Sequence, residues 1–179
     1  MQAFWGGKIV KARNSSGGYN GRVNFGMRDA RREDFDQLWR IDQACFSPEL
    51  AYSRLELAVF MKRRGAFTLV AEEPGAGKSA ARVLGFLVAE GNSKGVGHVI
   101  TIDVIAEARR AGVGSALLDG CEKKLRTQKQ QLVFLETPED NAAAIAFYKR
   151  HGYDELKTVP GYYANGMGAV VMRKKLAAA

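Results

Sequence analysis

The sequence predicts one mixed α/β domain built around a central sheet. Apolar, strand-like runs alternate along the chain with segments whose apolar residues recur at helical spacing. The length of 179 residues is typical of one domain, and 46% hydrophobic with 26% charged residues is an ordinary globular composition. No apolar run approaches the ~20 residues that a membrane-spanning helix requires.

The predicted elements run in the order strand, two helices, three strands, helix, strand, helix and two strands. The second helix begins at a capping box formed by Ser53 and Glu56, and Asn141 is the expected N-cap of the last helix. The predicted segments are a strand at Val23–Arg28, helices at Arg32–Cys45 and Ser53–Arg63, strands at 66–73, 82–91 and 97–106, a helix at Gly112–Thr127, a strand at 131–137, a helix at Asn141–His151, and strands at 153–159 and 168–176.

Residues 1–26 differ in composition from the rest of the chain. They hold four basic residues and no acidic ones, with many Gly, Ser and Asn. This composition is typical of a flexible segment, so we expect 1–26 to be a basic extension and 27–176 to be the folded domain. The extension supplies half of the net charge of +8, and such an excess suggests an anionic partner.

The two cysteines, Cys45 and Cys121, both fall on apolar faces of predicted helices. Neither has a metal-ligand partner at a useful spacing, so we expect buried, reduced thiols. Reduced thiols and an N-terminus without the apolar core of a signal peptide favour a cytoplasmic protein.

The segment "RRAGVGSALL", Arg109–Leu118, places two glycines and two arginines where a helix should begin. Glycine costs about 1 kcal/mol relative to alanine inside a helix, so Gly112 and Gly114 need another reason. A helix N-terminus exposes free N–H groups, and glycine lets an anion approach them without a Cβ in the way. The segment therefore predicts a pyrophosphate cradle. The alternative is an ordinary exposed helix start with incidental arginines.

A second segment, "NAAAIAFYKRHGY", places Asn141 and Tyr148 two turns apart on one helix face and ends that helix at Gly152. Two motifs in this order, Arg109-x-x-Gly112-x-Gly114 and Asn141-x-x-Ala144-x-x-x-Tyr148-x-x-x-Gly152-Tyr153, resemble those of the GNAT acetyltransferases. The predicted order of elements agrees with that family over essentially all of 27–176. The resemblance implies the GNAT fold, a central, mixed and mostly antiparallel sheet flanked by about four helices.

The resemblance also implies acetyl-coenzyme A as the acetyl donor. In the family the first motif binds the pyrophosphate through its backbone amides, and the preceding strand pairs with the pantetheine arm. Direct transfer is implied, with no metal and no covalent enzyme intermediate. Carried over to this chain, the cofactor-binding residues are Ile102, Asp103, Val104, Arg109, Arg110, Ala111, Gly112, Val113, Gly114, Ser115 and Asn141, and Tyr148 faces the sulfur.

Within the family, "LETPEDNAAAIAFY" and "GYYANGMGAVVM" resemble the protein N-terminal acetyltransferases, including those that act on ribosomal-protein alanine. Glu136 matches the proposed general base of that branch. Tyr162 and Tyr163 match its paired tyrosines at the peptide entrance. Glu49 matches an acceptor-binding acid, which places an acceptor groove between the loop Phe46–Tyr52 and the tyrosine pair, with Phe46, Glu49 and Tyr52 on one side.

Acyl transfer to an amine requires a neutral nitrogen and a stabilised leaving thiolate. An α-amine has a pKa of ~8 and a lysine amine ~10.4, so deprotonation at pH 7 costs roughly 1.4 kcal/mol for the first and more than 4 for the second. Glu136 is a weak base that acts through a water, which favours an α-amine acceptor. Because a phenol is less acidic than a thiol, we interpret Tyr148 as a hydrogen-bond donor to the departing sulfur.

The sequence therefore predicts an N-acetyltransferase that transfers acetyl from acetyl-CoA to a protein or peptide N-terminus, a ribosomal protein being one candidate. No membrane partner and no specific nucleic-acid binding are expected. One alternative is a small-molecule amine acetyltransferase, and another is a non-catalytic acyl-CoA-binding module. Alternative structural roles remain open for Glu136, Tyr148 and the tyrosine pair. His98 and His151 are expected to be structural, because neither belongs to a ligand or triad pattern.

Overall fold

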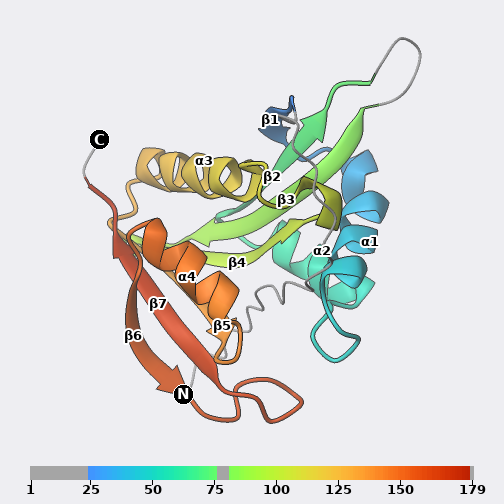
Figure 1. Cartoon of the computed structure of the whole chain (residues 1–179). Helices are drawn as coiled ribbons and strands as arrows, with labels where there is room; N and C mark the ends of the chain where they lie inside the picture. The colour runs from blue at the N-terminus through green and yellow to red at the C-terminus, as the bar shows by residue number, and fades with distance from the viewer. Residues whose placement is uncertain (1–23, 76–80, 178–179) are drawn as a thin grey trace.

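Seven strands form one sheet in the order β1-β2-β3-β4-β5-β7-β6 in this computed structural model, which describes residues 24–75 and 81–177 (Figure 1). The strands are β1 (Gly26–Asp29), β2 (Ala66–Glu73), β3 (Arg82–Gly91), β4 (Val96–Val104), β5 (Leu132–Pro138), β6 (Asp154–Val159) and β7 (Ala169–Lys175). The helices are α1 (Phe35–Cys45), α2 (Arg54–Lys62), α3 (Val113–Thr127) and α4 (Ala142–Arg150), with short 3-10 turns η1 (Arg32–Asp34) and η2 (Ala106–Ala108). The predicted basic extension lies outside the described residues, except for 24–26.

Neighbouring strands are antiparallel except for β4 and β5, which run parallel. A parallel pair needs a crossover connection, and α3 supplies it. The mixed, mostly antiparallel sheet with four α-helices confirms the predicted fold class. Every helix in the described ranges is too short or too polar to cross a membrane.

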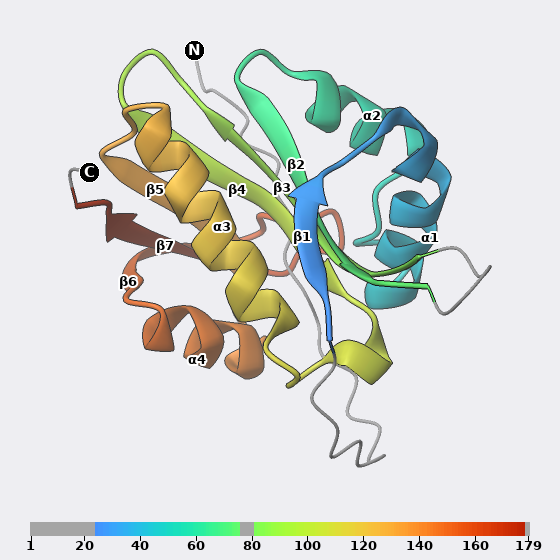
Figure 2. The same cartoon turned by 90° about the horizontal axis from the view of Figure 1, so that it is seen from above.

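The sheet separates two cores, with α1 and α2 on one face and α3 and α4 on the other (Figures 1 and 2). Side chains alternate across the sheet as strand geometry requires. On β3, Leu87 packs with the α3 and α4 core, whereas its neighbours Phe86 and Val88 pack with the α1 and α2 core. The two cores bury residues on both faces of the inner strands, whereas the edge strands β1 and β6 have no buried residue.

The helix caps expected from the sequence are confirmed. The Ser53 side chain accepts from the Glu56 N–H, and the Glu56 carboxylate accepts from the Ser53 N–H, which is the predicted capping box at the start of α2. Asn141 caps α4 by accepting from the Ala144 N–H at 3.1 Å. Both cysteines are free and buried, as expected.

The first helix begins later than predicted, because Arg32–Asp34 form a 3-10 turn before α1. The Asp34 carboxylate accepts from the Arg28 guanidinium at 2.6 and 2.9 Å and from the Arg31 N–H at 2.6 Å. These bonds hold the chain to β1 in a tight turn at the point where a regular helix would have started. The hydrogen bonds from Arg28 are also the main reason that the pKa of Asp34 is lowered.

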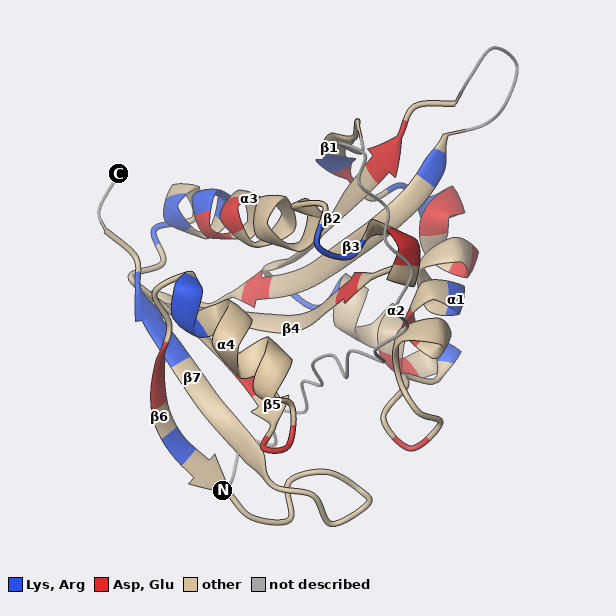
Figure 3. Cartoon of the chain, viewed as in Figure 1, with Lys and Arg blue, Asp and Glu red and all other residues tan. Residues whose placement is uncertain are grey.

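The charged side chains are unevenly spread over the described residues. Figure 3 shows Lys and Arg concentrated where α3, α4 and β7 end, next to the C-terminus. The exposed acids Asp154 and Glu155 lie beside them at the start of β6.

Candidate active site

The strands β4 and β5 separate after a short paired stretch. Only Val96–His98 of β4 pair with Leu132–Phe134 of β5, although β4 continues to Val104 and β5 to Pro138. Over Ile102–Val104 the edge of β4 that faces β5 therefore has no strand partner among the described residues. An unpaired strand edge offers N–H and C=O groups to an extended ligand. The gap in the sheet is the first feature of the site.

The second feature is the start of α3, immediately after β4 and η2. Gly112 is its N-cap with φ 85°, a left-handed conformation that side-chain-bearing residues adopt at a cost, and no side chain caps this helix. A Cβ at Gly112 would meet no atom within 4 Å, so the space over the helix start is open. The uncapped N–H groups of this 15-residue helix have the geometry that the predicted cradle requires.

Arg109 lies at the cradle, but its side chain turns back into the protein. Its Nε donates to the Val104 carbonyl at 3.0 Å, and Nη2 lies 3.7 Å from Cys45 Sγ at the end of α1. Arg109 thus joins the end of β4 to the end of α1, while the neighbouring Arg110 is exposed with φ 64°. The charge of Arg109 adds to the positive potential of the cradle, but the backbone supplies the donors that an anion would contact.

Asn141 and Tyr148 occupy the opposite side of the gap, on α4. Both are buried, with 4% and 1% of their surface exposed. Asn141 uses its carbonyl oxygen as the helix cap, and within the described residues its buried Nδ2 has no acceptor. Burial is the main cause that raises the pKa of Tyr148, and the nearby Asp103 raises it further. The phenol therefore stays protonated, and can donate a hydrogen bond.

Glu136 has a partner that sequence reasoning missed. His98 Nε2 lies 2.7 Å from Glu136 Oε2, and the two residues are 3% and 7% exposed. When Glu136 is ionised it can only accept, so Nε2 is then the donor of this bond. His98, for which the sequence predicts a structural role, thus lies against the predicted general base. The parallel register pairs His98 with Phe134, which lies two residues before Glu136. The side chains of His98 and Glu136 therefore lie on the same face of the sheet.

The tyrosine pair and the loop between α1 and α2 adjoin on the Glu136 face of the sheet. The rings of Tyr162 and Tyr163 meet edge to face at 5.0 Å, and Tyr163 belongs to the same core as Phe46 and Tyr52. The pKa of Tyr163 is raised mainly by burial and also by Tyr162 and Glu136, which places its phenol near the carboxylate. Tyr163 and the loop between α1 and α2 thus belong to one core.

The predicted acceptor residues of the loop differ in accessibility. Phe46 and Tyr52 are 7% and 2% exposed, and the Tyr52 ring packs 4.9 Å from Phe60. Both are core residues of the described structure, whereas Glu49 is exposed at the loop surface. Of the three, Glu49 is the side chain that an incoming peptide can reach without rearrangement.

Two buried carboxylates lie between α1 and β4. Asp42 and Asp103 are fully buried, and Thr101 Oγ1 donates to Asp103 at 3.2 Å. Burial raises the pKa of Asp103 well above its ordinary value, the nearby Asp42 raises it further, and Thr101 and Arg109 oppose the rise. Asp103 is therefore a carboxyl group that favours its neutral form in the folded protein.

Asp103→Asn is expected to stabilise the protein at pH 7 to 8. A carboxyl whose folded pKa is raised binds its proton more tightly in the folded state, so stability falls as pH rises above the unfolded value of about 3.9. Asparagine cannot ionise, so the variant lacks this fall. Urea unfolding at pH 5 and pH 8 measures the change in the free energy of unfolding of each protein between these pH values. A variant that loses as much stability as the wild type between these pH values would contradict the assignment.

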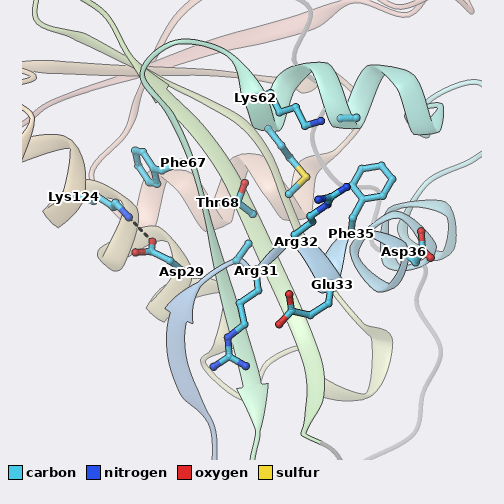
Figure 4. A pocket seen from close by; sticks show the side chains of 13 residues that line it. Asp29, Arg31, Arg32, Glu33, Phe35, Asp36, Lys62, Phe67, Thr68 and Lys124 are labelled. Carbon is cyan, nitrogen blue, oxygen red and sulfur yellow. Dashed lines mark hydrogen bonds and ion pairs between the residues drawn. The ribbon is translucent and has the colours of Figure 1, made fainter.

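A separate hollow of about 960 Å³ lies away from the gap, between β1, α2 and β2. Figure 4 shows Phe35, Lys62, Phe67 and Thr68 around it, and the ion pair between Lys124 and Asp29 at its edge. None of the residues predicted for catalysis or binding lines this hollow. The candidate site therefore rests on the strand separation and the groups that border it.

Comparison with known proteins decides the family. Residues 33–153 match the model of the acetyltransferase (GNAT) family. The chain belongs to the GNAT acetyltransferase family. A Sulfurisphaera tokodaii protein named N-alpha-acetyltransferase is 30% identical over 162 residues, which are 84% of this chain and 92% of that protein.

Solved acetyltransferase structures share the fold. Ard1 from Thermoplasma volcanium superposes with a TM-score of 0.74 at 27% identity, covering 85% of this chain and 97% of that one. The ribosomal-protein-alanine N-acetyltransferase of Escherichia coli superposes with a TM-score of 0.76 at 21% identity, covering 87% and 96%. Family membership confirms the expected N-acetyltransferase enzyme.

Proposed function

We propose that this acetyltransferase transfers the acetyl group of acetyl-CoA to the N-terminal α-amine of a protein or peptide. The observation that carries the proposal is the gap between β4 and β5, which has an anion cradle on one side and a histidine-held carboxylate on the other. Relatives named N-alpha-acetyltransferase that align over most of the chain support the choice of acceptor.

The described residues fit acetyl-CoA. The uncapped amides after Gly112 suit its pyrophosphate, and the free edge of Ile102–Val104 suits the amide groups of the pantetheine arm. The buried Nδ2 of Asn141 is a donor that lacks an acceptor in the described structure, and a carbonyl of the same arm would satisfy it. When bound, acetyl-CoA supplies an acetyl group activated as a thioester.

Glu136 is the proposed base for the incoming amine. Near pH 7 an α-amine with a pKa of ~8 is mostly protonated, so its proton must be removed before it can attack. His98 fixes one carboxylate oxygen of Glu136, which leaves the other to accept a proton directly or through a water. Loss of that proton allows the new C–N bond to form as the C–S bond breaks.

Tyr148 is the proposed donor to the leaving sulfur. Its raised pKa suits a group that keeps its proton and stabilises the thiolate through a hydrogen bond. On the acceptor side, Tyr162, Tyr163 and Glu49 are the proposed peptide-binding groups. A ribosomal protein is one candidate for the acceptor. The similarity to the Escherichia coli enzyme shows the fold alone and does not identify the acceptor.

An acceptor panel tests the proposed function. Purified protein is incubated with acetyl-CoA and, in separate reactions, short peptides with free N-termini, polyamines or aminoglycosides, and thiol release is followed. We expect turnover with peptides and little with the small amines. Turnover confined to the small amines would reject the peptide acceptor, and cofactor binding without turnover on any amine would reject the enzymatic role.

A further inference from the structure

Two segments of the chain are rich in cations and free of acids. No Asp or Glu lies between residues 123 and 135, and none follows Glu155. Four cations of these stretches form the surface described below: Arg126, Lys129, Lys174 and Lys175. The first stretch ends α3 and begins β5, and the second ends β7.

The fold brings both segments to one place. Lys175 pairs with Leu132 across β5 and β7, and the Leu176 N–H donates to the Gln131 carbonyl at 2.8 Å. Arg126, Lys129 and Lys175 together line a hollow of about 660 Å³ whose other lining residues carry no charge. Figure 3 shows Lys and Arg gathered where α3 and β7 end, next to the C-terminus. We call this surface the basic end and define it by Lys94, Arg126, Lys129, Lys174 and Lys175.

Lys94 joins the basic end through the turn between β3 and β4. The Gln131 N–H donates to the Gly95 carbonyl at 2.7 Å, which places the turn beside the start of β5. Lys94 is exposed on that turn. The basic end therefore draws cations from three separate stretches of the chain.

Acidic side chains neutralise only part of this charge. Glu122 is 3% exposed and is shared by Lys174, at 2.7 Å, and Arg126, at 3.1 Å. The ion pairs within residues 24–75 and 81–177 include none made by Lys94, Lys129 or Lys175. The exposed Asp154, which pairs with Arg173 across β6 and β7, also lies beside this surface. Because Lys94, Lys129 and Lys175 make none of these ion pairs, the surface keeps a net positive charge.

We propose that the basic end binds the phosphodiester backbone of a nucleic acid. Several lysines and arginines around a hollow match a ligand whose negative charges repeat along a chain. The surface lacks what a bilayer would need, because the apolar side chains lining the hollow are buried or half-buried Leu132 and Leu176 and a small alanine. The large exposed apolar residues of the described chain lie on β1, α2 and β6 instead.

The basic end and the proposed pyrophosphate cradle lie at opposite ends of β4. The basic end adjoins the start of that strand, and the cradle follows its last residue, Val104. Nine residues of strand span roughly 25 Å, so nucleic acid bound at the basic end would leave the cradle open. The proposal therefore stands apart from the proposed function.

The test is a charge reversal with a matched control. Lys129→Glu with Lys175→Glu removes the two unpaired cations of the hollow, and neither residue belongs to the proposed active site. Arg40→Glu with Lys157→Glu, two exposed cations on α1 and β6, changes the net charge equally. Fluorescence anisotropy with labelled RNA and DNA duplexes of one sequence, over a range of salt concentrations, gives affinity and salt dependence for the full chain.

We expect the basic-end variant to bind at least tenfold more weakly, with a salt slope lower by about two, because each lost phosphate contact removes about one unit. The control pair should stay near wild type. A preference for RNA would identify RNA as the source of the phosphates, and equal binding would assign the site to either backbone. The basic-end variant should acetylate short peptides at the wild-type rate and should melt at the wild-type temperature.

Three results would overturn the proposal: equal losses in the two variants, wild-type affinity in the basic-end variant, or binding to anionic phospholipid vesicles without binding to either duplex. An assay of peptide acetylation distinguishes failure of this proposal from failure of the proposed function. An active enzyme that ignores nucleic acid contradicts only the basic end, and an inactive protein that binds nucleic acid contradicts only the transferase proposal.

Discussion

Gly112→Val is expected to abolish the rise in melting temperature that acetyl-CoA gives the wild type. A ligand at about a hundred times its Kd stabilises the folded state by about 2.7 kcal/mol, or roughly 5 to 10 °C for a protein of this size. The Val side chain would project into open space above the helix start, where the pyrophosphate is proposed to lie. Differential scanning fluorimetry with and without acetyl-CoA measures the shift.

Gly152→Val is the matched control for this experiment. Gly152 has φ 81°, close to the 85° of Gly112, and lies at the end of α4, away from the cradle. Both variants should melt a few degrees lower without ligand, because a non-glycine residue in this conformation costs about 1–3 kcal/mol. Only Gly112→Val should lose the shift. A full shift in Gly112→Val would contradict the cradle.

Glu136→Gln is expected to lower kcat by about a hundredfold or more, with little effect on cofactor affinity. Glutamine keeps the shape of the side chain and can still bond to His98, but it cannot accept the proton of the amine. Above about pH 8 the α-amine is mostly neutral, so the activity of the variant should partly recover as the pH rises. Steady-state rates from pH 6 to 10 measure both effects. Wild-type kcat in the variant would show that Glu136 is not the base.

His98 should act through Glu136 as a positioning residue. His98→Ala is expected to lower kcat about tenfold, the kinetic equivalent of one lost hydrogen bond to a charged group. His98→Gln should restore part of the loss, because its amide can donate to the carboxylate. The peptide KM should stay close to wild type in both variants. Equal kcat values in the Ala and Gln variants would instead indicate a packing role.

Features that depend on residues close together in the sequence could be predicted from the sequence. The caps at Ser53 and Asn141 satisfy N–H groups within three residues, so their signals are local. The glycine cradle is local as well, because Gly112 lies in the helix start that it shapes. These signals, with the family resemblance, were enough to predict the fold, and they are the basis of the proposed cofactor side of the site.

Features that depend on strand register could not be predicted. His98 and Glu136 are 38 residues apart, and only the parallel pairing of β4 with β5 brings them within 2.7 Å. Nothing in either segment alone indicates that pairing. Phe46 and Tyr52 raise a different difficulty, because a loop aromatic suits a core as well as a binding groove. The direction of the Arg109 side chain likewise depends on α1, which is distant in sequence.

The measurement that tests the central claim most directly is the position of the acetyl group on a peptide that carries both a free N-terminus and an internal lysine. The protein, acetyl-CoA and the peptide are incubated at pH 7, and fragmentation mass spectrometry locates the modification. A second peptide with a blocked N-terminus and the same lysine is the control. The account predicts acetyl on the α-amine of the first peptide and no reaction of the second. Acetyl on the lysine side chain of either peptide, at a rate equal to that of the α-amine, would contradict it.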